Sequence, residues 1–230
     1  MGDSLAFTII QLCGILAAVG LFASPAPDLL RIHRTRRIGE VSVVPLISLF
    51  GSGYIWSIYG LFMDDIFPVV ITNAIGVLAA TIYTSIYFYH TTEKRYVGKL
   101  LAGVGLALAA VTLYSLLAVG GVTNQTHKEA GKIVGFLAVA VNIILFASPF
   151  ETVVHIVRTK NASSLPITLC FVAMINCTLW VLYGVIDNDM FVLTPNALGF
   201  IFSVVQDEGM VFTKLKSPAA GVEPLRAGNE

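Results

Sequence analysis

The chain repeats one long segment of its own sequence, and this duplication limits the possible folds more than any other feature. The run Phe-Ala-Ser-Pro at 22–25 returns at 146–149. In both copies a proline then opens an apolar run, the pattern Trp-x-x-Tyr-Gly follows, and the copy closes on Asn-x-x-Gly. The offset stays between 121 and 124 residues, and both copies run in the same direction. Parallel repeats of this kind are typical of transporters with a central site between two halves.

The composition indicates a membrane protein. Hydrophobic residues make up 56% of the chain and charged residues 12%, with a mean hydropathy of +0.82, whereas soluble domains carry about 25% charged residues. A helix needs about 20 apolar residues to cross a bilayer. Runs of suitable length predict an all-α integral membrane protein with seven spans, near 5–30, 43–62, 66–89, 100–119, 131–156, 165–186 and 190–206.

The repeat divides the predicted spans into two parallel three-helix bundles joined by a linker helix (3+1+3). The first bundle is expected at 5–89 and the second at 131–206, with a cytosolic tail at 207–230. The intervening segment, 90–130, contains the one span without a counterpart. Three spans alone would leave the second bundle inverted in the membrane, and this fourth span brings it back to the orientation of the first bundle. The seventh span is short, because Met190 to Val205 gives only about 24 Å of helix against a core of about 30 Å. We therefore expect it to end near 206.

The basic residues predict the orientation. Twelve of the 14 lysines and arginines follow the first, third and fifth spans or lie in the tail, and only Lys128 and Lys132 fall on the other side. The positive-inside rule then places the N-terminus outside or in a lumen and the C-terminus in the cytosol. The net charge of zero argues against a nucleic-acid partner.

Polar residues within the spans indicate the kind of ligand. No charged residue lies in the middle of any span, which argues against proton or ion coupling. Neutral residues recur instead at matched positions: Asn73 and Asn196, Trp56 and Trp180, Ser52 and Asn176. Carboxamides donate and accept hydrogen bonds, and indoles add an apolar face, so the set suits a sugar. An asparagine can also join helices and a tryptophan can anchor the interface, but the pairing favours a binding site. Neither a cofactor nor a metal is expected, and no cluster of reactive residues predicts an enzyme.

Four prolines also recur in pairs: Pro25 with Pro149, and Pro45 with Pro166. Each proline removes a backbone donor and bends or ends a helix. Pro45 and Pro166 also suit the first turn of a helix, and all four prolines are consistent with plain loop boundaries. Since they lie at one membrane face, we interpret them as hinges of an inner gate.

These motifs resemble the SWEET sugar transporters of plants (the MtN/saliva family, in the PQ-loop clan), over about residues 5–206. The resemblance implies bidirectional, uncoupled sugar transport across the vacuolar or plasma membrane by rocking of the two bundles. The substrate would be a mono- or disaccharide, and the protein would lie in a lipid bilayer. The sequence leaves open whether the chain forms a homo-oligomer. In this family, hinge prolines correspond to Pro25, Pro45, Pro149 and Pro166, and sugar-binding residues to Asn73, Asn196, Trp56 and Trp180.

The resemblance also gives size-selective pocket positions, which are Leu21, Ser52, Leu145 and Asn176, and an extracellular gate pair, Tyr59 with Asp189. A second gate contact in the family joins a tyrosine, here Tyr183, to a lysine, and this chain has Asp65 instead. The paired leucines and the bulk of Asn176 predict a pocket for a monosaccharide such as glucose.

Two other functions fit the sequence less well. Another member of the PQ-loop clan would carry an amino acid or other metabolite, but the chain lacks Pro-Gln, having Pro25-Ala26 and Pro149-Phe150 instead. A seven-helix receptor has no reason to duplicate three of its helices.

Overall fold

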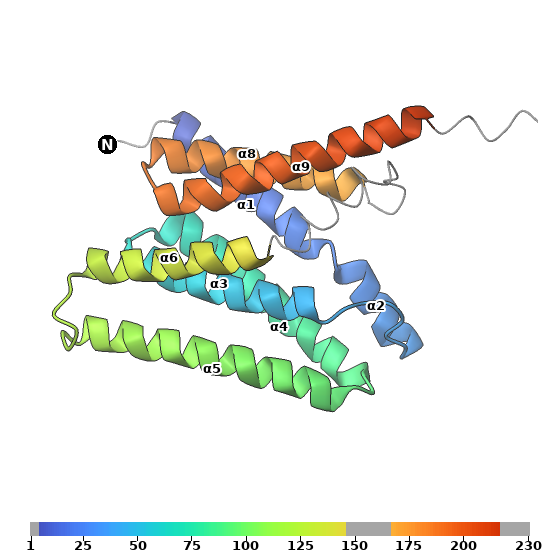
Figure 1. The fold of residues 1–230 in the computed structure, drawn as a ribbon, viewed down its shortest axis with the longest axis horizontal. Helices are drawn as coiled ribbons and strands as arrows, with labels where there is room; N and C mark the ends of the chain where they lie inside the picture. Colours follow the sequence, from blue (N-terminus) through green and yellow to red (C-terminus); the bar gives the residue numbers. More distant parts are fainter. Residues whose placement is uncertain (1–4, 146–166, 217–230) are drawn as a thin grey trace, which may run out of the picture.

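The computed structural model describes residues 5–145 and 167–216, which form helices joined by short turns (Figure 1). No β-strand occurs in these two ranges. The elements are α1 (Leu5–Ala23), α2 (Ala26–Thr35), α3 (Val44–Phe62), the π-helical turn η1 (Ile66–Val70), α4 (Ile71–His90), α5 (Lys94–Val119), α6 (His127–Leu145), α8 (Ile167–Ile186) and α9 (Met190–Lys216).

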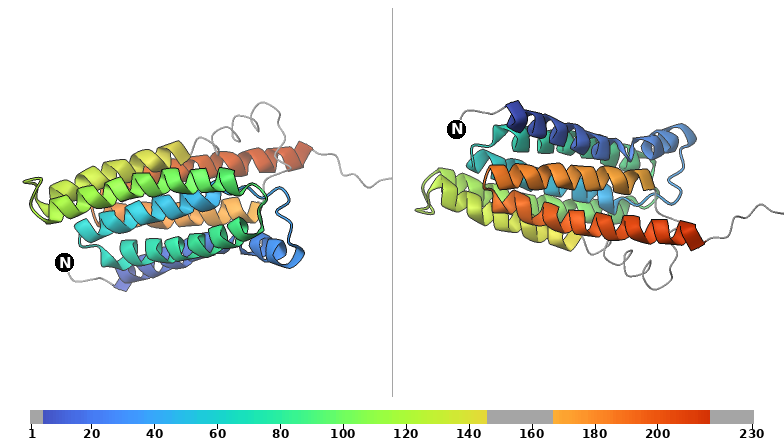
Figure 2. Two further views of the ribbon diagram at one scale, coloured as in Figure 1. Left: turned by 90° about the horizontal axis from the view of Figure 1, so that it is seen from below. Right: turned by 90° about the horizontal axis from the view of Figure 1, so that it is seen from above.

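The long helices run side by side and alternate in direction (Figures 1 and 2). Within the described ranges, four segments are long and apolar enough to cross a membrane: Leu5–Thr35, Val44–Phe62, Ile66–His90 and Lys94–Val119. Phe171–Ile186 and Met190–Val205 are shorter apolar segments. The predicted seven spans correspond to α1, α3, α4, α5, α6, α8 and α9, in agreement with the expected all-α fold.

Two predicted span limits differ from the structure. The first span is broken at Pro25, where α1 stops and the short α2 begins, because proline has no N–H to continue the helical bonds. Leu29 and Ile32 bury the apolar face of α2. Helix α9 continues to Lys216, past the predicted end of the seventh membrane span near 206. The sequence after Val205 is polar, but it contains good helix formers such as Gln206 and Glu208.

Helix packing follows the duplication. Helix α1 packs against α8, and α3 packs against α6. Since α1 corresponds to α6 and α3 to α8 in the repeat, these two contacts are equivalent, and each joins one copy to the other. Helix α5 packs against α3 and α6 at the edge of the assembly. A core cluster that includes Trp56, Tyr59, Trp180 and Tyr183 fills the space between the copies.

The glycine of the Tyr-Gly motif is needed for close packing in both copies. A Cβ atom on Gly60 would lie 2.8 Å from a side-chain carbon of Val70, and one on Gly184 would lie 2.9 Å from the backbone nitrogen of Leu193. Both distances are too short for nonbonded atoms. The repeated glycine therefore lets η1 approach α3 and lets α9 approach α8.

Candidate functional site

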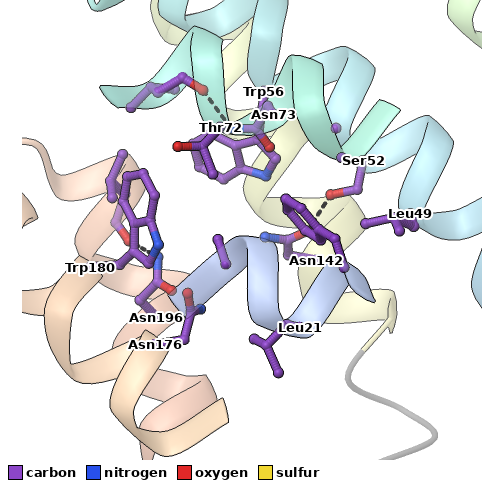
Figure 3. A pocket seen from close by; sticks show the side chains of 16 residues that line it. Leu21, Leu49, Ser52, Trp56, Thr72, Asn73, Asn142, Asn176, Trp180 and Asn196 are labelled. Carbon is purple, nitrogen blue, oxygen red and sulfur yellow. Dashed lines mark hydrogen bonds between the residues drawn. The ribbon is translucent and has the colours of Figure 1, made fainter. Parts of the chain in front are cut away.

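A cavity of about 210 Å³ lies between the two copies of the repeat (Figure 3). Its walls come from α1, α3, η1, α4, α6, α8 and α9. Seven of the eight predicted binding residues line it: Leu21, Ser52, Trp56, Asn73, Asn176, Trp180 and Asn196. The side chain of the eighth, Leu145, lies outside the described part of the structure. None of the described lining residues is charged.

The two matched asparagines have the same local geometry. Nδ2 of Asn73 donates to the carbonyl oxygen of Val69 at 2.9 Å, and Nδ2 of Asn196 donates to that of Val192 at 2.8 Å. Each bond reaches back four residues, so the side chain is held against its own helix. Because these bonds use amide donors, the carboxamide oxygen of each asparagine is left as an acceptor for a ligand.

The two tryptophans are buried in the core between the copies. Trp56 and Trp180 are each 7% exposed, which does not fit an anchor at the membrane interface. Each indole meets the tyrosine three residues later edge-on, at 5.4 Å from Tyr59 and 5.6 Å from Tyr183. This arrangement fixes both indoles at the cavity wall, where their apolar faces can pack against a ligand.

Two polar residues of the cavity, Asn142 and Thr72, are not among the predicted site residues. Asn142 accepts a hydrogen bond of 2.9 Å from Oγ of Ser52, which joins α6 to α3 across the cavity (Figure 3). A search for matched polar pairs misses Asn142 because its counterpart in the first copy is Ala18. The available signal was a lone carboxamide within the apolar span. The other unpredicted lining residues are Ala18, Phe22, Leu49, Gly53, Val69, Gly76 and Val192.

The cavity is therefore polar on both sides but not symmetric. Ser52 and Asn142 satisfy one another, whereas the buried Oδ1 of Asn176 has no hydrogen-bond partner among the described residues. Asn176 corresponds to Ser52 in the repeat, and Ala18, the counterpart of Asn142, offers it no polar group. A ligand hydroxyl in the cavity would give Asn176 the partner that it lacks.

Two tyrosine–aspartate bonds join the copies near the ends of α3 and α8. The Tyr59 hydroxyl donates to both carboxylate oxygens of Asp189 at 2.8 Å, as expected for the predicted pair. The Tyr183 hydroxyl donates to Asp65 at 2.5 Å. The resemblance had implied a lysine at this second contact, and the structure shows the carboxylate of Asp65 in that role.

The surroundings of Asp65 alter its acidity. This residue lies in the turn between α3 and η1, outside the spanning segments, and also accepts a bond of 3.3 Å from the Val69 N–H. Burial raises the pKa of Asp65 above its ordinary value, although the bonds from Tyr183 and Val69 act in the opposite direction. The charges of Asp187 and Asp189 raise this pKa further.

The predicted hinge prolines are only partly described. Pro25 lies at the N-cap of α2, and Pro45 lies in the first turn of α3. Both line a surface groove of about 800 Å³ at the end of the assembly opposite the tyrosine–aspartate bonds. Pro149 and Pro166 fall outside the described residues.

Comparison with known proteins identifies relatives over most of the chain. Residues 8–95 and 132–216 match the sequence model of a family described as "Sugar efflux transporter for intercellular exchange". "Bidirectional sugar transporter SWEET7b" of Oryza sativa subsp. japonica is 30% identical over 202 residues, covering 86% of this chain and 74% of the relative. "Sugar transporter SWEET1" of Drosophila pseudoobscura pseudoobscura is 29% identical, and the alignment covers 89% of this chain and 88% of that relative.

The fold is also that of a solved structure. "The 3.7 A resolution structure of a eukaryotic SWEET transporter" superposes with a TM-score of 0.78 at 22% identity, covering 92% of this chain and 98% of the other. The relatives include insect as well as plant proteins, so the similarity extends beyond the plant members. With the duplicated helices, the paired asparagines and tryptophans and the match of both copies to the family model, this chain belongs to the SWEET sugar transporter family.

Proposed function

We propose that the protein is a passive, bidirectional carrier of a small sugar, with the central cavity as its binding site. The observation that carries this proposal is the uncharged cavity between the copies, lined by the matched Asn73 and Asn196 and the matched Trp56 and Trp180. The relatives' names, which describe bidirectional sugar transport, support the same function.

The chemistry of the cavity suits a sugar. Carboxamide oxygens of Asn73, Asn196 and Asn176 accept hydrogen bonds, and a sugar offers many hydroxyl donors. Indole faces of the two tryptophans pack against apolar C–H groups. An amino acid would bring charges that none of the described lining residues balances, and a buried charge without a partner is costly.

Transport requires the cavity to open to each side in turn. The bonds Tyr59–Asp189 and Tyr183–Asp65 tie the two copies together at one end of the cavity. We infer that they form the outer gate, and that rocking of the two copies breaks them while Pro25, Pro45, Pro149 and Pro166 act as hinges at the opposite end. Since no titratable side chain is among the described cavity residues, the movement is coupled to no ion.

The size of the cavity favours a monosaccharide. Its volume of about 210 Å³ lies below the range of roughly 300–1,000 Å³ for pockets that hold drug-sized ligands. Leu21 of α1 and Asn176 of α8 line the cavity and limit its size. Glucose-like sugars therefore fit better than sucrose.

We also propose the orientation given by the basic residues, in a vacuolar or plasma membrane. The end that carries α2 and the start of α5 lies in the cytosol, with the C-terminus. The tyrosine–aspartate end faces the lumen or the outside, with the N-terminus.

The test is uptake into proteoliposomes that contain the purified protein. Labelled glucose should equilibrate across the membrane, sucrose should enter more slowly, and labelled leucine should not enter above the level of empty liposomes. Uptake of leucine with no uptake of either sugar would favour the amino-acid carrier and overturn the proposal.

A further inference from the structure

A second cavity lies on the outside of the assembly, between α4 and α5. It has a volume of about 460 Å³ and shares no lining residue with the sugar cavity. The two helices meet at the turn between His90 and Lys94 and separate toward the other end, with α3 between them (Figures 1 and 2). The lining residues are Phe50, Thr81, Thr84, Ser85, Phe88, Tyr89, Lys94 and Leu101. We call this the α4–α5 groove.

One hydroxyl in the groove has no partner. Thr84 is 8% exposed, and its Oγ1 makes no hydrogen bond among the described residues. The threonines Thr72, Thr81 and Thr112 each donate to the backbone carbonyl four residues earlier. Thr84, which lies in α4 with Thr72 and Thr81, makes no such bond. Buried hydroxyls are nearly always hydrogen-bonded, and Thr84 lines this groove, so a molecule seated in the groove can supply the acceptor.

The groove includes one positively charged side chain, that of Lys94. Nζ of the exposed Lys94 lies 5.9 Å above the Phe88 ring centroid. In the part of the chain that the structure describes, no carboxylate forms an ion pair with Lys94. Arg95 and Lys99 follow on the same helix and add positive charge at this membrane face. The groove therefore combines an apolar body, a buried donor and an unpaired cation at the level where α4 and α5 end.

We propose that the α4–α5 groove binds a phospholipid with an anionic headgroup. Its phosphate lies at Lys94, an ester carbonyl accepts the bond from Thr84, and an acyl chain packs on Phe50 and Leu101. In the orientation proposed above, this end faces the cytosolic leaflet, which carries the anionic lipids, and basic pockets between helices on that side suit their headgroups. A sterol would fill the apolar part but would bring no anion for Lys94.

The test measures lipid binding and does not depend on transport. Delipidated protein in a neutral detergent is titrated with dioleoyl phosphatidylglycerol or dioleoyl phosphatidylcholine, which have the same chains, and the first bound lipid is followed by native mass spectrometry. Phosphatidylglycerol should bind more tightly. Lys94→Gln should weaken it about fivefold, as expected for one basic residue at an anionic lipid, and should leave phosphatidylcholine unchanged.

The hydroxyl has its own matched pair of variants. Thr84→Val should weaken both lipids about fivefold, the effect of one lost hydrogen bond. Thr81→Val removes a hydroxyl from the same groove that already donates to Val77, so it should change binding less than twofold. Lys99→Gln, which lies outside the groove, serves as the control for general surface charge.

Several results would overturn the proposal. Equal affinity for the two lipids, or equal losses in Lys94→Gln and Lys99→Gln, would reduce the effect to unspecific attraction. Equal effects of Thr81→Val and Thr84→Val would remove the role of the buried hydroxyl. Displacement of the lipid by cholesterol, or by a second copy of the chain at high protein concentration, would assign the groove to that occupant. Thermal unfolding midpoints without lipid show whether each variant is folded.

Discussion

Tyr59 donates hydrogen bonds of 2.8 Å to both carboxylate oxygens of Asp189, and in doing so it joins the first copy of the repeat to the second. The counterpart of this bond runs the other way, from Tyr183 of the second copy to Asp65 of the first. Tyr183 is the counterpart of Tyr59 in the repeat, and Asp65 is the counterpart of Asp189. Each tyrosine therefore bonds to the aspartate of the other copy, and we call the two contacts the crossed pair. Opening this end of the cavity has to break both bonds.

The crossed pair predicts a pH dependence of the outer gate. With the gate closed, burial raises the pKa of Asp65, whereas in an open gate water would return it toward the ordinary value of about 3.9. The closed gate therefore binds a proton more tightly. Its extra stability is fully present below the ordinary pKa and is lost as the pH rises through the raised value. Influx from that side should slow when the outer pH is lowered at constant inner pH.

The charged groups around Asp65 define the controls. Asp187, Asp189 and Lys132 line the same surface pocket, and burial raises the pKa of Asp187 as well. Asp65→Asn should flatten the pH profile of influx in the region just above the ordinary carboxyl pKa. Asp64→Asn, at the exposed neighbouring position, should leave the profile as in the wild type. An unchanged profile in Asp65→Asn would show that another group titrates.

Features that recur in both copies could be read from the sequence. The Asn, Trp and Tyr-Gly motifs each occupy equivalent places, and a parallel duplication brings such places together around one cavity. The residues that break the repeat were harder to predict. Asn142 has only Ala18 as its counterpart, and its role depends on its contact with Ser52, a residue 90 positions away.

Two further features depended on the three-dimensional context. A carboxylate at position 65 is not the lysine that the resemblance implied, and only the geometry shows that Tyr183 can donate to it. The end of the seventh span was inferred from hydropathy, but a helix can continue in polar sequence, as α9 does to Lys216. Hydropathy reports where a helix can lie in lipid, and backbone propensity decides where it ends.

Removal of either matched asparagine should abolish sugar uptake. Asn73→Ala or Asn196→Ala takes an acceptor from the cavity, and each buried group left unpaired costs about 1–3 kcal/mol. Uptake of labelled glucose into proteoliposomes measures the effect, with the amount of folded protein checked by size-exclusion chromatography. Thr194→Ala is the matched control, since Thr194 also bonds to the backbone four residues earlier on α9 but is exposed and does not line the cavity. Near-normal uptake by both asparagine variants would contradict a central site.

Transport should bring the sugar to equal concentrations on the two sides and no further. None of the described cavity residues is ionisable, so neither a pH difference nor a membrane potential should drive accumulation. Outer pH can change the rate through Asp65 without changing this end point. The measurement is the final ratio of inner to outer glucose in proteoliposomes with an imposed proton gradient. Accumulation that a protonophore collapses would refute uncoupled transport.

The selectivity between sugars should depend on the bulk of the residues at the cavity wall. Leu21 and Asn176 line the cavity in the structure, and Leu145 is the counterpart of Leu21 in the repeat. Discrimination by size alone is worth only about 1–3 kcal/mol, so the wild type should prefer glucose to sucrose by a modest factor.

Shortening these three side chains together is the test of that size argument. The triple variant Leu21→Val, Leu145→Val and Asn176→Ser removes methylene groups and one carboxamide, so the cavity gains room for a second ring. The ratio of sucrose to glucose uptake should then rise, because the larger sugar gains room while Asn73, Asn196 and the two tryptophans are retained. Competition between the two labelled sugars in the same proteoliposomes gives the ratio directly. If the wild type already moves sucrose faster than glucose, size at these positions does not set the selectivity.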